Sequence, residues 1–288
     1  MTNQTDNHIP PPDGDRPNAR PAVPVARPLH ADLKPGGPAP GYTPLAGLAD
    51  DLKLRELDRR AALLDFLLVL VAAVVFPYLP QFLIAMEAAD IEIELGGVLI
   101  VQKWCEAGLG VALLVYLALR HGLPWRRFGL RSDGAARQLL YGLGGTLLAY
   151  GGLLVGTVVL LAMAVLTPGV ADSLEQRLDF LEELPTLSLG QQVLLLVAVA
   201  VHEEIIFRGL LIPYLARLTG RWWPAIVCSS LVFALLHVPA QGWLGAMQIV
   251  FVSLALGGLF VVTRSLPAAM IAHFLFDLLQ FQLMNLLK

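Results

Sequence analysis

The chain has 288 residues, of which 56% are hydrophobic and only 15% are charged. Soluble domains carry about a quarter charged residues, so this composition excludes an ordinary soluble domain and predicts a polytopic membrane protein. The formal net charge is -3, and no segment gathers the basic footprint that phosphate binding needs, which excludes a nucleic-acid partner.

The first segment of the chain differs in kind from the rest. Prolines crowd the stretch from Ile9 to Pro44, which has almost no aromatic residues. Such a composition cannot bury enough apolar surface to offset the loss of chain entropy. We therefore predict a disordered, proline-rich cytoplasmic tail over residues 1–52 and a transmembrane domain over residues 53–288.

Apolar runs of about 20 residues, the length that crosses a bilayer as a helix, recur after this tail. They predict an all-α bundle of about seven spans, within a range of six to eight. The runs lie near 63–84, 96–119, 139–166, 189–217, 222–237, 244–262 and 267–287.

The connections between these runs predict an orientation. Lysine and arginine concentrate before the first run and between the second and the third, and such residues favour the cytoplasmic side. We expect an integral protein of a bacterial plasma membrane, surrounded by lipid, with its N-terminus in the cytoplasm. The basic residues are Lys53, Arg55, Arg59, Arg60, Arg120, Arg126, Arg127, Arg131 and Arg137.

Four ionisable side chains interrupt the apolar runs of the last third of the chain: Glu203, Glu204, His237 and His273. An ionisable group at bilayer depth costs several kcal/mol, so such residues face a protein interior or a water-filled cavity and mark function. A catalytic or transport site inside the membrane is the first hypothesis. Lys103 and Glu106 are also unexpected at this depth, but their i,i+3 spacing predicts a structural ion pair near the outer interface.

The first short pattern, EExxxR, begins at Glu203. On a helix Glu204 and Arg208 stand at i,i+4, so the guanidinium can hold Glu204 as a paired anion. Glu203 points about 100° away and has no cation nearby in the sequence, which leaves it free for chemistry. The zinc-binding HExxH motif is absent, because the position four after His202 is Ile206.

Two further patterns follow. Phe233 and His237 form FxxxH at the end of one apolar run. His273 and Asp277 stand at i,i+4, which places an imidazole and a carboxylate on one helical face. Each histidine alone is more often a core residue than a functional one, whereas the histidines together with the glutamates favour a site.

The order and spacing of these patterns resemble the CPBP family of intramembrane metalloproteases, the CAAX protease and bacteriocin-processing (Abi) family. EExxxR is followed by FxxxH about thirty residues later, and then by a histidine with an amide or acid four residues on. The resemblance covers residues 190–287, which would form the protease-like core. The resemblance departs at Asp277, where the family usually has asparagine. This difference matters chemically, because a carboxylate cannot donate the hydrogen bond that an amide donates.

The resemblance implies a catalytic set of Glu203, Glu204, Arg208, His237, His273 and Asp277. In it Glu203 and His237 would activate water, and His273 with residue 277 would support the oxyanion or the site. Two mechanisms stay open: a zinc ion held by Glu203, His237 and His273, as the metalloprotease label implies, or a general base without metal.

The implied substrate is a peptide or membrane-anchored protein, prenylated in the CAAX case. Two alternatives remain: a membrane scaffold that keeps the fold without turnover, and a proton-coupled transporter. A transporter would be expected to have inverted repeats, for which the sequence has no sign.

Overall fold

A computed structural model describes residues 52, 54–79, 95–131, 134–166 and 187–287 of the chain. Every regular element in this described part is helical, as predicted. The predicted N-terminal tail lies outside it. The elements are α2 (Arg59–Val75), α4 (Leu95–His121), η2 (Trp125–Phe128), α5 (Ala135–Leu166), α7 (Leu189–Glu203), η3 (Glu204–Leu211), α8 (Ile212–Thr219), α9 (Trp222–Thr263) and α10 (Leu266–Leu287).

Four segments of the described helices are long and apolar enough to cross a membrane: Gly96–His121, Ala135–Met163, Trp222–Thr263 and Leu266–Leu286. The protein is therefore a helical membrane protein. The predicted count of about seven spans is not confirmed by these four.

The helix boundaries differ from the predicted runs at two places for local reasons. α2 ends at Val75, close before Pro77, which lacks the N–H that would continue the helix. Runs 222–237 and 244–262 belong to the single long element α9, which is interrupted at Gly242, where φ is 66° and ψ is 176°. Only glycine adopts this backbone conformation without strain, so Gly242 turns α9 into two arms.

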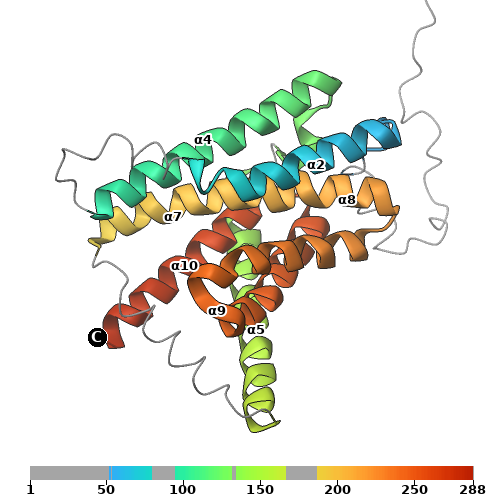
Figure 1. Cartoon of the computed structure of the whole chain (residues 1–288). Coiled ribbons are helices and arrows are strands. Elements are labelled where there is room, and N and C mark those ends of the chain that lie inside the picture. Colours follow the sequence, from blue (N-terminus) through green and yellow to red (C-terminus); the bar gives the residue numbers. More distant parts are fainter. Residues whose placement is uncertain (1–51, 53, 80–94, 132–133, 167–186, 288) are drawn as a thin grey trace, which may run out of the picture. The chain divides into compact units, whose positions relative to one another are not determined.

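Small residues let α5 approach α9 and α10 closely, and these three helices lie side by side (Figure 1). Gly142, Gly145, Ala149, Gly152 and Gly156 recur at intervals of three and four, which places them in one stripe along α5. A Cβ added at Gly152 would lie 2.6 Å from the carbonyl oxygen of Phe251 in α9. Small residues at membrane helix interfaces permit such backbone contact.

Replacing Gly152 by alanine should therefore destabilise the protein. The added methyl group would push α5 away from the α9 backbone, and overpacking of this kind costs about 1–3 kcal/mol. The matched control is Gly151→Ala, because a Cβ at Gly151 meets no heavy atom within 4 Å. Melting temperatures in detergent should fall for Gly152→Ala and stay level for Gly151→Ala. Equal melting of both variants would contradict the close approach.

α2, α4 and α8 meet at the buried carboxylate of Asp65. Its Oδ2 lies 2.6 Å from Nε2 of His121 and accepts a hydrogen bond from the Tyr214 hydroxyl at 3.3 Å. Arg120 reaches Oδ1 at 3.2 Å. Since a buried carboxylate must be paired or hydrogen-bonded, this cluster fixes the three helices relative to one another. Asp65, His121 and Tyr214 lie far apart in the sequence.

α4 and α7 run in the same direction, side by side (Figure 1). Near their first turns, a Cβ at Gly96 would meet the Leu187 side chain. Further along, Nδ1 of His202 donates to the carbonyl oxygen of Glu106 at 2.8 Å. These contacts fix the position of α4 relative to α7 along the helix axes.

Candidate active site

The EExxxR pattern lies where the helix changes its winding. α7 ends at Glu203, and Glu204–Leu211 form the π-helical segment η3 rather than the regular α-helix that we predicted. Pro213 supplies a physical reason. In an α-helix its ring would clash with the carbonyl of Gly209, and it cannot donate to that carbonyl, so wider turns before it relieve the conflict. Such π-helical segments occur frequently at functional sites.

Arg208 and Glu204 form the predicted ion pair, and the pair is fully enclosed. Nη1 of Arg208 lies 2.8 Å from Oε1 of Glu204, with side-chain exposures of 1% and 0%. Arg208 also donates to the Ser253 hydroxyl at 3.1 Å and lies 4.9 Å from the centre of the Phe233 ring. Hydrogen bonds and a cation-π contact thus satisfy a guanidinium that burial would otherwise penalise.

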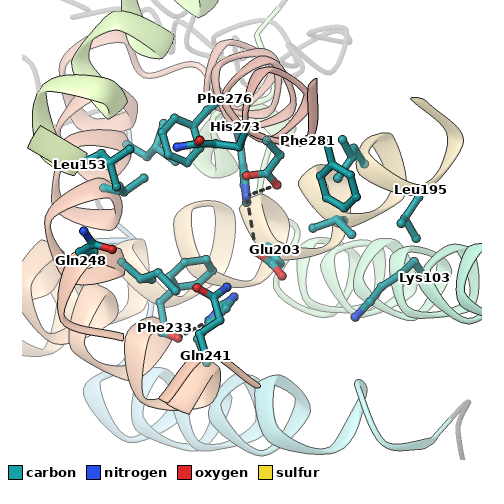
Figure 2. A pocket seen from close by; sticks show the side chains of 18 of the residues that line it. Lys103, Leu153, Leu195, Glu203, Phe233, Gln241, Gln248, His273, Phe276 and Phe281 are labelled. Atoms are coloured by element: carbon teal, nitrogen blue, oxygen red, sulfur yellow. Dashed lines mark hydrogen bonds and ion pairs between the residues drawn. The ribbon is translucent and has the colours of Figure 1, made fainter. Parts of the chain in front are cut away.

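His273 joins this pair to the glutamate beside it. Its Nδ1 donates to Oε1 of Glu204 at 2.8 Å, the same oxygen that Arg208 contacts. Its Nε2 lies 3.3 Å from Oδ2 of Asp277 and 3.7 Å from Oε2 of Glu203. Figure 2 shows His273 directed toward Glu203. Both ring nitrogens therefore face carboxylates, and the predicted His273–Asp277 pairing is present.

A cavity of about 480 Å³ opens on one side of this cluster. Glu203, His237, His273 and Asp277 all line it, whereas Glu204 and Arg208 are buried outside its lining. The six residues predicted for the site thus form two layers. The outer layer faces the cavity, and the inner pair holds His273 from behind.

His237 presents its free ring nitrogen differently from His273. Its Nδ1 lies 2.8 Å from the carbonyl oxygen of Phe233, and because a carbonyl only accepts, Nδ1 is the donor. In the neutral ring Nε2 then carries a lone pair that can accept a proton. No direct bond joins His237 to Glu203 in the described part of the chain, although both line the same cavity.

The aromatic residue of FxxxH has a packing role. The Phe233 ring lies 4.5 Å from the His237 ring and 6.4 Å from the His273 ring, centre to centre. It also packs edge-on against Phe207 of η3 at 4.8 Å. Phe233 therefore holds the two histidines apart and limits their rotation.

A metal was predicted on Glu203, His237 and His273. Within the described ranges, no three His, Cys, Asp or Glu side chains are arranged so that they could hold a metal ion. The contacts of His273 are with carboxylates, which leaves its nitrogens committed to hydrogen bonds. The metal stays a prediction, which elemental analysis of the active protein tests.

Four polar cavity residues were not predicted as part of the site: Lys103 of α4, Gln241 and Gln248 of α9, and Gln280 of α10. Lys103 forms the predicted pair with Glu106, Nζ to Oε2 at 2.8 Å, yet its side chain also reaches the cavity. The available signal was a lysine, Lys103, within an apolar run. We had interpreted it only as the ion-pair partner of Glu106. The glutamines gave no signal, because an uncharged amide in a membrane helix is not unusual.

One protein-family model matches the part of the chain that contains the candidate site. Residues 185–279 match the family model described as type II CAAX prenyl endopeptidase Rce1-like. Neither the curated proteins nor the solved structures give a significant match to the chain. The matched region contains all three sequence patterns and every member of the two-layered cluster. Residues 185–279, about a third of the chain, are therefore similar to the CAAX prenyl endopeptidase family.

Proposed function

We propose that the protein is an intramembrane endopeptidase that hydrolyses a peptide bond of a membrane-associated or prenylated substrate. The observation that carries the proposal is the cavity, which is lined by the carboxylate of Glu203 and by the ring of His237, whose Nε2 can accept a proton. Peptide hydrolysis needs an activated water and donors for the tetrahedral oxyanion. The family match supports a CAAX-type endopeptidase in general.

In the proposed mechanism Glu203 is the general base. A water between Glu203 and Nε2 of His237 attacks the carbonyl carbon while one of its protons passes to Glu203. The carbonyl π bond breaks and its electron pair becomes the oxyanion. When the C–N bond breaks, the protonated Glu203 returns the proton to the leaving amine, so the base ends the cycle unchanged.

His273 and Asp277 form the other wall of the proposed site. Nδ1 of His273 donates to Glu204, so Nε2 carries a proton only when the ring is the imidazolium. In that form Nε2 can donate to an oxyanion that forms beside Glu203. Asp277 accepts from His273 and therefore orients the ring, where an asparagine would add a donor of its own. Glu204 and Arg208 act through His273 and are positioning residues.

A digestion experiment in reconstituted membranes tests the proposal. A prenylated peptide should be cleaved by the full chain in lipid vesicles, and mass spectrometry would identify the two products. A scaffold without turnover would bind the peptide and release nothing. A proton-coupled transporter would instead dissipate a pH gradient across the vesicle membrane without forming products.

The metal requirement is predicted separately. If Glu203 and His237 activate water without a metal, active purified protein should contain far less than one metal ion per chain, and chelator should leave the rate unchanged. Elemental analysis of the active protein measures this directly. If a zinc ion is required, activity should fall with chelation and return with added zinc, and His237→Ala should lose the bound metal.

A further inference from the structure

Two glutamine side chains that line the cavity, Gln241 and Gln280, have no hydrogen-bond partner among the described residues. Both side chains are half-buried. Each of the other glutamines in the described ranges does have a partner: Gln102, Gln138, Gln191, Gln192, Gln248 and Gln282. A polar group that loses water without gaining a partner costs free energy. Two unpaired amides that face one cavity are therefore suited to bind a ligand there.

Each of these glutamines follows a proposed site residue by one helical turn. Gln241 stands four residues after His237 in α9, and Gln280 stands three residues after Asp277 in α10. Helical spacing places the members of each pair on one face, about 6 Å and 4.5 Å apart along the axis at 1.5 Å per residue. Figure 2 shows Gln241 across the pocket from His273 of α10. The two amides thus belong to two different walls of the cavity.

The first arm of α9 and α10 run in the same direction along the cavity. The two arms of α9 fold back on each other at Gly242, since Gly257 of the second arm lies against Ile226 of the first. The second arm and α10 follow α5 in opposite directions, as their neighbours along α5 show: Gly145 with Leu259 and Ala272, Gly152 with Phe251, and Tyr150 with Phe276. Two reversals restore the direction. Both glutamines therefore lie on the same side of the proposed catalytic residues, toward the turn at Gly242.

A glutamine amide matches the chemistry of a peptide main chain. Its oxygen accepts hydrogen bonds and its NH₂ group donates them, while each peptide group offers one N–H and one C=O. Because the amide is uncharged, it does not compete with Glu203 for a proton. An extended chain advances about 3.3 Å per residue. Peptide groups within about three residues of a bond cut at Glu203 can therefore reach the level of the two glutamines.

We propose that Gln241 and Gln280 bind the main chain of the substrate, within about three residues of the cleaved bond and on one side of it. The proposal rests on the proposed function, because it names how the cavity holds the peptide that is cut. The two amides bind peptide groups from two walls, so this stretch of the substrate is extended while its side chains can vary. Gln241 and Gln280 are substrate-binding residues, separate from the pair that activates water.

Peptides with single ester bonds test this proposal by binding to the inactive variant Glu203→Gln, full length and in lipid nanodiscs. A fluorescent prenylated peptide is compared with versions in which one backbone amide at a time is an ester, which removes that N–H. The scissile bond stays an amide in all of them. Esters at one or two positions, all on the same side of the scissile bond, should weaken binding about three- to tenfold, as expected for one lost hydrogen bond. Replacing the glutamine that binds there, by Gln241→Leu or Gln280→Leu, should bring the ester-to-amide ratio at that position to within twofold.

Gln282→Leu is the matched control. It removes an amide from the same helix as Gln280, but Gln282 donates to Gln192 at 2.7 Å and is not among the cavity-lining residues. This variant should keep the full sensitivity to the esters. Gln241→Leu and Gln280→Leu should melt with the parent, because neither breaks a hydrogen bond among the described residues. The proposal is overturned if no ester weakens binding more than twofold, if sensitive positions fall on both sides of the bond, or if the sensitivity survives both leucine variants.

The two proposals fail in different ways. Ester sensitivity that depends on Gln241 or Gln280, in a protein that cleaves nothing, would refute the endopeptidase and keep the main-chain binding site. Cleavage of every ester-containing peptide with the KM of the parent peptide would do the reverse, since it keeps the endopeptidase and removes the main-chain binding site.

Discussion

Glu203→Gln should lower kcat for peptide hydrolysis by a factor of about 10²–10⁴ while the protein still inserts and folds. Glutamine keeps the size of the side chain but cannot take a proton from water. The variant should still fold, because Glu203 has one ionic contact in the described part of the chain, His273 at 3.7 Å, and little stability depends on its charge. Initial rates on a prenylated peptide, measured beside a melting curve in detergent, separate catalysis from folding.

Glu56→Gln provides the control for this experiment. Glu56 pairs with Arg127 away from the cavity, and its side chain is 52% exposed. Its substitution should change neither the rate nor the melting temperature. Turnover by Glu203→Gln equal to that of the parent would remove Glu203 from the base role and, with it, the proposed mechanism.

Arg208→Ala should have the largest effect on stability. The substitution leaves the Glu204 carboxylate, with 0% exposure, without its guanidinium. Removing one partner of a buried pair typically costs about 3–5 kcal/mol. His273 still donates to the same oxygen and offsets part of this loss, whereas the contacts of Arg208 with Ser253 and the Phe233 ring add to it. Folded yield and melting temperature in detergent should both fall.

Two further variants show whether the charge pair is responsible. Arg126→Ala removes an exposed arginine of η2 and should leave the melting temperature unchanged. Glu204→Gln combined with Arg208→Met removes both charges, so it should be more stable than Arg208→Ala alone. If Arg208→Ala melts with the parent, the pair is not buried in the folded protein.

Local contacts of the site followed directly from the sequence. Glu204 with Arg208, His273 with Asp277, and Lys103 with Glu106 all stand three or four residues apart on helices, and all three pairs are present. Helical periodicity brings such pairs together whatever the rest of the chain does. The class of helical membrane protein also followed from the sequence, because a long apolar run in a bilayer satisfies its backbone hydrogen bonds by forming a helix.

The contacts that assemble the cavity could not be predicted in this way. His273 meets Glu204 across 69 residues, and Asp65 meets Tyr214 across 149. Such contacts depend on how the helices cross and rotate against one another. No periodic pattern encodes such offsets.

The sequence by itself determined which residues are ionisable inside apolar helices, and therefore which residues a membrane site had to use. Only the tertiary structure decided which of them face the cavity. Glu203 lines it and Glu204 does not, although they are neighbours in the chain. Lys103 was predicted only as the ion-pair partner of Glu106, yet it reaches the same cavity from another helix. The reason is physical: a helix fixes the angle between its own side chains, but the packing of neighbouring helices determines what each side chain meets.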